Sequence, residues 1–147
     1  MSDSVGTPQW LFCAAVNLYG YFELDVCADK SNAKAEEYYT EKDNGLLKRW
    51  YALNWCNPPY SDPLPWVHKA IEESKFGKST VLLLPADLST EYAKLSFDYW
   101  VDILGQRIKF DGHTGSPKFG SMFVYISPQK FKGVRYFDKE TIKGWKK

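Results

Sequence analysis

The most constraining stretch of this chain is Tyr51-Ala52-Leu53-Asn54-Trp55-Cys56-Asn57-Pro58-Pro59-Tyr60. Residues 51–56 are mostly apolar or aromatic, as in a buried strand. Each of the two prolines that follow fixes φ and lacks a backbone N–H donor, and the residue before them, Asn57, is pushed out of the helical region. The sequence therefore predicts a strand that ends in a rigid polar turn, which presents a side-chain amide, backbone carbonyls and an aromatic ring.

Strand-like and helical patterns alternate on both sides of this turn. Thr7 and Pro8 predict a helix start, with Thr7 as the cap and Pro8 in the first helical position. Ser89 or Thr90 is expected to cap a later helix. The expected helices span residues 8–19, 33–39, 44–50 (a turn or two), 64–76 and 89–100, and the expected strands span residues 22–28, 51–56, 80–85, 101–104, 107–110, 122–126 and 134–137.

This order of elements predicts an α/β fold. We expect a compact three-layer arrangement around an open, largely parallel sheet that is finished by antiparallel C-terminal strands. The length predicts one domain over residues 1–147, with residues 1–6 and 140–147 as flexible ends. In such sheets ligands bind beyond the carboxyl ends of the strands. Polar clusters follow three expected strands, at residues 25–29, 57–60 and 85–87, so we expect them to share one cleft.

The composition argues against several classes of protein. The chain is 44% hydrophobic and 17% aromatic, which is enough for a core, and it contains no apolar run long enough to span a membrane. Its polar first residues do not resemble a signal peptide. Three scattered cysteines, Cys13, Cys27 and Cys56, favour reduced thiols in the cytoplasm. With only two histidines and no metal-ligand spacing, no metal site is expected.

Charge is distributed unevenly along the chain. Residues 1–100 carry nine basic and fourteen acidic side chains, a balance of −5, whereas residues 101–147 carry ten and four, a balance of +6. A basic last third can contact a phosphate backbone, or it can be an ordinary solubilising tail. The charge pattern alone favours neither interpretation.

The turn at residues 57–60 suits one particular chemistry. The side-chain oxygen of Asn57 and the carbonyl of Pro58 can each accept one hydrogen of a planar exocyclic amine, such as N6 of adenine, while Tyr60 stacks on the ring. Held in this way, the nitrogen lone pair points toward an electrophile, and such orientation can supply several kcal/mol. This chemistry requires no metal, histidine base or cysteine nucleophile.

Beyond the turn, several blocks of the chain resemble the small phage-type DNA N6-adenine methyltransferases (the phage Dam family). The resemblance covers about residues 7–126. It rests on Thr7-Pro8, Leu24-Asp25-Val26-Cys27-Ala28-Asp29, Asn32-Ala33-Lys34, Tyr39-Thr40, Asp43, Trp55-Cys56-Asn57-Pro58-Pro59-Tyr60-Ser61, Pro65-Trp66-Val67, Leu83-Leu84-Pro85-Ala86, Arg107-Ile108-Lys109-Phe110 and Met122-Phe123-Val124.

The resemblance implies a Rossmann-like fold, S-adenosylmethionine as methyl donor and adenine in double-stranded DNA as acceptor, in the cytoplasm of the host cell if a phage encodes the chain. It also implies roles for individual residues. Asn57, Pro58, Pro59 and Tyr60 would form the catalytic turn. The cofactor set would comprise Thr7, Pro8, Trp10, Asp25, Cys27, Ala28, Asp29, Asp43 and Asn57, with Trp10 alternatively a core residue and Asp29 alternatively a helix cap.

The DNA contacts are expected near the turn and in the basic last third. Ser61 can touch the substrate backbone or cap the next helix, and residues 112–118 can enter a DNA groove or form an ordinary hairpin loop. The expected DNA-binding residues are Ser61, Arg107, Lys109, His113 and Lys118.

The chain departs from the wider methyltransferase pattern at one place, because residues 28–32 contain no glycine where a glycine-rich loop usually follows the first strand. Glycine at such a place lets the backbone approach a ligand closely. This absence leaves open a non-catalytic DNA-binding or decoy protein with the same fold. Because the same turn would also suit other planar amines, a methyltransferase that acts on RNA adenine or on a protein glutamine amide stays open as well.

Overall fold

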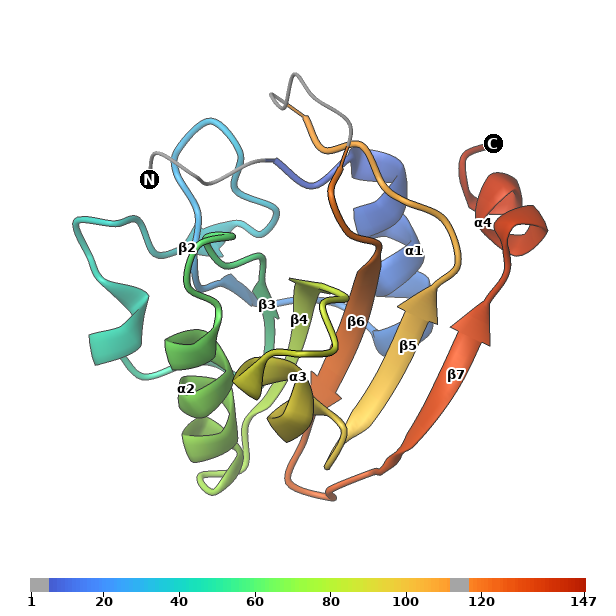
Figure 1. Ribbon diagram of the computed structural model, residues 1–147. Coiled ribbons are helices and arrows are strands. Elements are labelled where there is room, and N and C mark those ends of the chain that lie inside the picture. Colours follow the sequence, from blue (N-terminus) through green and yellow to red (C-terminus); the bar gives the residue numbers. More distant parts are fainter. Residues whose placement is uncertain (1–5, 112–116) are drawn as a thin grey trace.

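Seven strands form one sheet in the computed structural model, which describes residues 6–111 and 117–147 (Figure 1). Across the sheet the strands follow the order β2-β1-β3-β4-β6-β5-β7. The strands are β1 (Leu24–Asp25), β2 (Glu37–Tyr38), β3 (Leu53–Cys56), β4 (Ser79–Pro85), β5 (Trp100–Leu104), β6 (Ser121–Ile126) and β7 (Gly133–Phe137). The helices are α1 (Gln9–Tyr19), η1 (Gly45–Leu47, a 3-10 helix), α2 (Leu64–Ser74), α3 (Glu91–Ser96) and α4 (Lys139–Trp145).

The sheet is largely parallel, as the sequence predicts. β1 pairs in parallel with β2 and β3, and β3 with β4. β6 is antiparallel to both β4 and β5, and β7 is again parallel to β5. Among the described strands, therefore, only β6 runs against the others. The predicted antiparallel ending is correct for β6 and wrong for β5 and β7, because the chain leaves β6 at the lower edge of the sheet and must run upward again in β7 (Figure 1).

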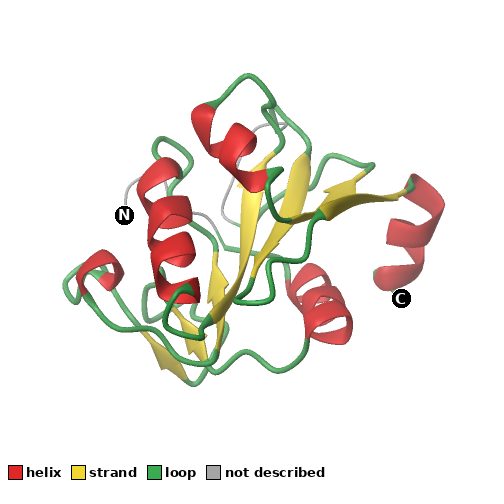
Figure 2. Cartoon of the chain, turned by 90° about the horizontal axis from the view of Figure 1, so that it is seen from below, coloured by secondary structure: helices red, strands yellow, loops and turns green. Residues whose placement is uncertain are grey.

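Helices cover both faces of the sheet and give the three layers that the sequence predicts (Figure 2). Alternate residues of β4 point to opposite faces: Leu82 and Leu84 pack in the cluster that includes α2 and α3, whereas Val81 and Leu83 pack in the cluster that includes α1 and α4. This explains why the sequence of β4 is continuously apolar. In the second cluster the fully buried ring of Trp55 meets Phe12 edge to face, 5.2 Å between centroids.

A partly buried ionic cluster ties α1 to β5 and β7, the last two strands in the order across the sheet. Arg135 on β7 donates two hydrogen bonds to the buried carboxylate of Asp102 on β5, at 2.7 and 3.0 Å. The hydroxyl of Tyr19, at the end of α1, donates to the same carboxylate. Burial, and then this hydrogen bond, raise the pKa of Tyr19. Because a buried charge is costly when it is unpaired, the cluster fixes how α1 lies on the sheet.

The helix expected at residues 33–39 is absent. The carboxylate of Asp29 instead accepts hydrogen bonds from the backbone N–H groups of Ser31 and Asn32, at 2.9 and 3.1 Å, and the carboxylate of Asp25 accepts from the N–H of Lys34 at 3.0 Å. These local side-chain contacts hold the backbone in a non-helical turn. The chain then continues into β2, which pairs with β1. Asp29 consequently caps a turn and not a helix.

Other boundaries differ in smaller ways. The strand expected at residues 22–28 is reduced to β1, and the helical turns expected at residues 44–50 are reduced to η1. The helix expected at residues 89–100 ends at Ser96, although Thr90 is its cap, as predicted. Thr7 is not a helix cap, because Pro8 occupies that position and no side chain bonds to the first turn. Residues 107–110 are not a strand, yet Ile108 and Phe110 are buried.

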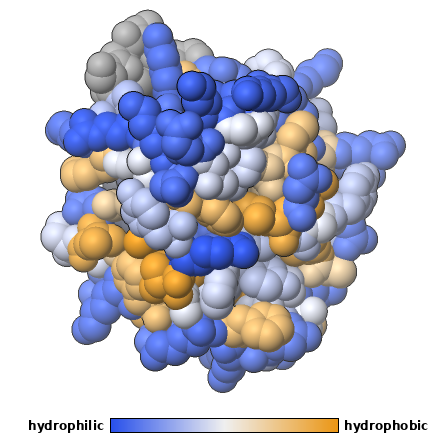
Figure 3. All heavy atoms as spheres, turned by 90° about the vertical axis from the view of Figure 1, so that its right-hand side faces the viewer, coloured by the Kyte–Doolittle hydropathy of each residue, from blue (hydrophilic) through white to orange (hydrophobic). Residues whose placement is uncertain are grey.

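The expectation of a flexible end over residues 140–147 is wrong for most of that segment, which forms α4. Asp138 caps this helix by accepting a hydrogen bond from the N–H of Thr141 at 2.8 Å, and Ile142 is fully buried against the α1 side of the core. Figure 3 shows the side of the molecule where β7 and α4 lie, and apolar surface is visible there between the charged groups. No helix in the described residues is long and apolar enough to cross a membrane.

We predict that Ile142→Ala lowers the free energy of unfolding by about 2–4 kcal/mol, because it leaves a cavity where α4 packs on the core. Urea unfolding followed by circular dichroism measures this change. The matched control is the exposed neighbour Lys143, whose replacement by alanine is expected to change the stability by less than about 0.5 kcal/mol. Equal stabilities of the two variants would show that α4 does not dock in solution.

Candidate functional site

The rigid turn, residues 57–60, follows β3 directly, and the neighbouring strands β1 and β4 end on either side of it. Asn57 is 7% exposed, and its side-chain nitrogen donates a hydrogen bond to the hydroxyl of Thr7 at 3.1 Å. The segment before α1 is held in turn by a two-way backbone pairing of Gly6 with Asp111, at 3.2 and 2.9 Å. The turn is therefore buried and tied to the beginning of the described chain.

A cavity of about 650 Å³ lies on one side of the turn, beyond the ends of β3 and β4. Tyr60 lines it, and its ring meets Phe110 edge to face with the centroids 5.6 Å apart. Burial raises the pKa of Tyr60 to about 12, so its hydroxyl stays protonated at neutral pH. The other lining residues include Pro85 at the end of β4, Asp87 and Thr90 after it, and Ile108, Lys118 and Phe119.

A second cavity, of about 400 Å³, lies on the β1 side of the same turn. Val26 and Cys27, just after β1, line it on one side, and the loop of residues 40–46 forms a wall through Thr40, Glu41, Asn44, Gly45 and Leu46. Its lining combines polar groups, such as Thr40 and Glu41, with the apolar side chains of Leu46 and Trp66. Such a mixture suits a ligand that has both hydroxyl groups and a flat ring.

The turn separates these two cavities. Pro59 lines the smaller cavity and Tyr60 lines the larger one, while Ser61 and Asp62 line both. The arrangement can hold two different molecules on opposite sides of one short, stiff segment. The polar clusters that the sequence predicts after three strands are thus brought together at one edge of the sheet, but they serve two cavities and not one cleft.

Asn57, Thr7 and Asp25 border a third, much smaller space of about 10 Å³, close to the second cavity through Cys27. Asp25 is almost completely buried and accepts hydrogen bonds from the N–H groups of Cys27 and Lys34, at 3.3 and 3.0 Å. Burial raises the pKa of Asp25 to about 6, against the opposing effect of these two bonds. A carboxylate in such a position favours a cationic ligand.

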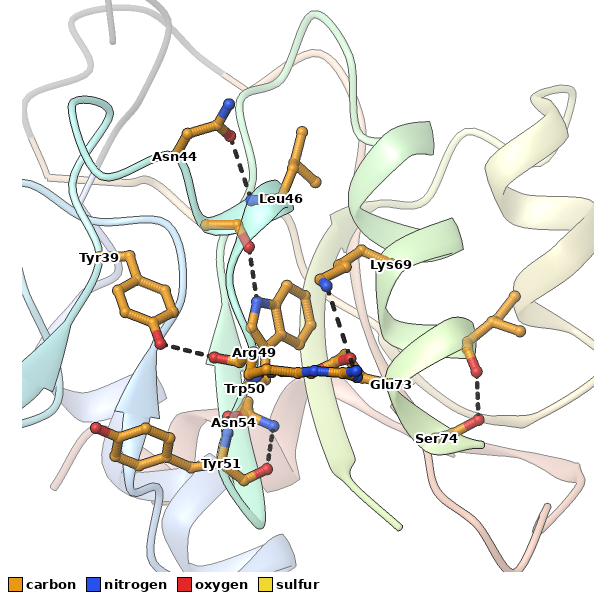
Figure 4. Close-up of polar contacts among 12 residues, drawn as sticks. Tyr39, Asn44, Leu46, Arg49, Trp50, Tyr51, Asn54, Lys69, Glu73 and Ser74 are labelled. Carbon is orange, nitrogen blue, oxygen red and sulfur yellow. Dashed lines mark hydrogen bonds and ion pairs between the residues drawn. The ribbon is translucent and has the colours of Figure 1, made fainter. Parts of the chain in front are cut away.

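Hydrogen bonds of Trp50 hold the wall of the smaller cavity in place (Figure 4). The indole N–H of Trp50 donates to the carbonyl of Gly45 at 2.9 Å, and the backbone N–H of Trp50 donates to the buried carboxylate of Glu73 at 2.6 Å. Gly45 lies so close to β1 that a Cβ atom there would be 2.2 Å from the carbonyl oxygen of Val26. Glycine is therefore required at this position for close backbone approach.

The remaining cofactor candidates do not line the two larger cavities. Ala28 is buried, and its N–H donates to the carbonyl of Tyr39 at 2.9 Å. Asp43 is exposed and accepts hydrogen bonds from the N–H and the hydroxyl of Thr40. These bonds shape the wall, but Asp43 itself does not line the cavity. Pro8, Trp10 and Asp29 are not among the described residues that line the three cavities. The ring of Trp10 lies instead 5.0 Å from the Lys146 ammonium.

The candidate DNA-binding residues lie partly around the larger cavity. Lys118 lines it and Ser61 lines both cavities. Arg107 and Lys109 are exposed on the segment that carries Ile108 and Phe110, and Arg107 donates to the carbonyl of Pro117 at 3.2 Å. His113 lies outside the described residues.

Sequence reasoning missed most of the wall of the smaller cavity. Its members are Thr40, Glu41, Asn44, Gly45 and Leu46. The signal that was available is the Asn44-Gly45 pair, a typical turn dipeptide. Asn44 indeed adopts a left-handed conformation, with φ 55°, and its side chain accepts from the N–H of Leu46. Nothing in the local sequence shows that this turn packs against the end of β1.

Comparison with known proteins gives consistent matches. Residues 1–124 match the family described as "DNA N-6-adenine-methyltransferase (Dam)". A DNA N-6-adenine-methyltransferase of Escherichia phage T1 is 39% identical over 93 residues, which are 61% of this chain and 39% of the phage protein. A protein of the same name from Haemophilus phage HP1 is 40% identical over 93 residues, 61% of this chain and 54% of that protein. A putative methyltransferase of Escherichia coli, YfdM, is 36% identical over 73 residues, 45% of this chain and 76% of that protein. The matched region is thus only 39% and 54% of the length of the two phage relatives.

We predict that Gly45→Ala destabilises the protein by about 1–3 kcal/mol, because the added methyl group collides with the Val26 carbonyl, which cannot move without disturbing β1. Thermal unfolding measures this effect. Gly144→Ala is the matched control, since a Cβ there meets nothing within 4 Å, and in helix α4 alanine is expected to stabilise by about 0.5–1 kcal/mol. A stable Gly45→Ala variant would refute the close packing of this loop on β1.

Proposed function

Because the chain belongs to the DNA N-6-adenine-methyltransferase (Dam) family, we propose that it transfers a methyl group from S-adenosylmethionine to the N6 amine of adenine in double-stranded DNA. One observation carries this proposal: the turn at residues 57–60 stands between two cavities, with Pro59 facing one and Tyr60 the other. A methyl transfer needs a donor and an acceptor on opposite sides of the point where the new bond forms, and this geometry provides both places.

The smaller cavity fits S-adenosylmethionine. Its polar lining residues Thr40 and Glu41 can bind ribose hydroxyl groups, and Leu46 and Trp66 can pack on the adenine ring. The positively charged methionine end would extend toward Asp25, whose buried carboxylate lies at the adjoining small space. The missing glycine-rich loop does not oppose this assignment, because Gly45 brings a backbone segment close to β1 from another part of the chain.

The larger cavity fits the target base. Its volume of about 650 Å³ lies within the ordinary range of ligand pockets, about 300–1,000 Å³. Its lining is mainly apolar and includes the rings of Tyr60 and Phe110, on which a flat base can stack. Because a base inside a duplex cannot reach this cavity, the adenine would be turned out of the helix.

The turn would orient the amine for transfer. Among the turn residues Tyr60 lines the larger cavity and would stack on the base, whereas Asn57 and Pro58 do not line it, so the amine would have to reach past Tyr60 for the side-chain oxygen of Asn57 and the carbonyl of Pro58 to accept its two N–H bonds. The hydrogen bond from Asn57 to Thr7 restricts the rotation of the amide, so that the side chain is already oriented. The donor supplies a methyl group bound to a positively charged sulfur. As the nitrogen lone pair forms the new C–N bond, the C–S electron pair returns to sulfur, and the nitrogen then releases a proton to water.

Basic side chains near the larger cavity would hold the DNA backbone. Lys118 lines the cavity, and Arg107 and Lys109 are exposed on the adjoining segment. Together with Ser61, these side chains would contact phosphates and position the duplex without reading its sequence. This use of the basic last third favours DNA contact over a solubilising role.

We predict that Asn57→Ala lowers the rate of methyl transfer to DNA by at least about a hundredfold, because the amine loses one of the two groups that orient it. Binding of S-adenosylmethionine is expected to change little. Transfer of a labelled methyl group measures the rate, and calorimetry measures the binding. Asn17→Ala, on the exposed side of α1, is the control and should keep full activity.

The same assay with separate pools of double-stranded DNA, RNA and protein identifies the acceptor. Labelling of DNA adenine alone supports the proposal. Labelling of RNA or of glutamine would mean that the same methyl transfer acts on a different substrate. Donor binding without any labelling would identify a non-catalytic DNA-binding protein. An Asn57→Ala variant with full turnover on DNA would contradict the role of Asn57.

We also predict that donor binding weakens below about pH 6. The pKa of Asp25 is raised to about 6, so this carboxyl group carries a proton at lower pH and must lose it to attract a cation. The dissociation constant should therefore increase by up to about tenfold per pH unit below pH 6 and stay constant above it. Calorimetry from pH 5 to pH 7.5 tests this, and Asp25→Asn should remove the dependence. A wild-type dissociation constant that does not vary with pH would exclude contact between Asp25 and the donor.

A further inference from the structure

We infer that Glu73 is a positioning residue for the methyl donor, although it lies on α2 and lines neither cavity. It acts through Trp50 on Gly45, and so sets the position of the wall formed by residues 40–46. The inference rests on the proposed function, because it assigns the smaller cavity to S-adenosylmethionine.

The first step is the contact between Glu73 and Trp50. The side chain of Glu73 is fully buried, and one of its oxygens accepts the backbone N–H of Trp50 at 2.6 Å, across 23 residues of sequence. A buried backbone N–H without an acceptor is costly, so Glu73 fixes where residue 50 can lie relative to α2. The ring of Trp50 also stacks on that of Trp66, with centroids 6.5 Å apart.

The second step links Trp50 to the cavity wall. The indole N–H of Trp50 donates to the carbonyl of Gly45 at 2.9 Å. Gly45 in turn lies directly against the carbonyl of Val26 at the end of β1. Gly45 is packed tightly against Val26 and cannot move closer to it. A shift of Trp50 would therefore displace the loop that carries Gly45 and change the shape of the smaller cavity.

A second contact also holds the loop close to Trp50. The hydroxyl of Tyr39, just after β2, donates to the carbonyl of Arg49, the residue before Trp50, at 2.6 Å, and Asp43 accepts from Thr40. These bonds hold the loop to β2, whereas the bond from Trp50 to Glu73 holds it to α2. Loss of the Glu73 contact would leave the Tyr39 bond in place and loosen the attachment of Trp50, and with it Gly45, to α2.

Two cations compensate the charge of Glu73. Its second oxygen lies 3.5 Å from the guanidinium of Arg49 and 3.6 Å from the ammonium of Lys69. Within the described residues this oxygen has no hydrogen-bond partner. A leucine would remove both the acceptor for Trp50 and the partner of the largely buried Lys69 ammonium, whereas glutamine removes only the charge and keeps an acceptor for Trp50.

The test compares donor binding in four proteins by calorimetry: the wild type, Glu73→Leu, Trp50→Phe and Ser74→Ala. Glu73→Leu removes the acceptor, and Trp50→Phe removes the bond to Gly45 while keeping an aromatic ring. Each is expected to weaken S-adenosylmethionine binding by about tenfold, as the loss of one buried hydrogen bond implies. Ser74→Ala is the control, since it removes a buried bond to Ile71 on the same helix and does not touch Trp50.

Kinetics separates positioning from general damage. In both variants the KM for the donor should increase while kcat at saturating donor and the affinity for DNA stay unchanged, and Glu73→Gln, which keeps an acceptor oxygen, should restore most of the affinity. Unchanged donor affinity in Trp50→Phe, or an equal loss in Ser74→Ala, would overturn the inference even if Glu73→Leu fails to fold. A wild-type protein that does not bind S-adenosylmethionine would overturn the proposed function itself, and this inference with it.

Discussion

Two consecutive prolines at the end of β3 impose the constraint on which the site depends. They prevent the chain from continuing into a helix or a paired strand, and they leave the turn without two backbone donors. Because β3 lies between β1 and β4, the turn emerges where the ends of both neighbours also open. This stiff turn lies between the two cavities, with Pro59 on one side and Tyr60 on the other.

The surroundings of the two cavities differ in the way that the proposed reaction requires. On the donor side, the buried carboxylate of Asp25 and the polar wall favour a cationic, hydroxyl-bearing molecule. On the acceptor side, Tyr60 and Phe110 favour a flat, uncharged ring. The segment from Gly6 to Thr7 joins these sides, because it pairs with Asp111 and also accepts the Asn57 side chain. The segment that carries Phe110, at the larger cavity, and the segment that carries Thr7, at the small space beside Asp25, are therefore held to each other.

The sequence predicts an element well where the element's own residues determine it, and poorly where contacts with distant residues determine it. The apolar run of β4, the turn after β3 and the helix α2 are all predictable from their own residues. The helix expected at residues 33–39 fails because the carboxylate of Asp25, nine positions earlier, captures the N–H of Lys34. The end of the chain forms α4 because Ile142 finds a buried site beside α1, which no local pattern indicates. The turn at residues 57–60 could thus be located from sequence, whereas the wall of the smaller cavity could not.

That wall also explains how the chain manages without a glycine-rich loop after β1. Such a loop brings backbone close to a ligand from within the strand–helix connection. Here the residues after β1 are occupied by the turn around Asp29, and the close approach is made instead by Gly45, which comes from the other side and touches the end of β1. A glycine turn is held by its own hydrogen bonds, but a segment that arrives from elsewhere needs an external anchor. Glu73 on α2 supplies that anchor through Trp50, which lies before β3, so the inferred position of the wall depends on a residue that does not line the smaller cavity.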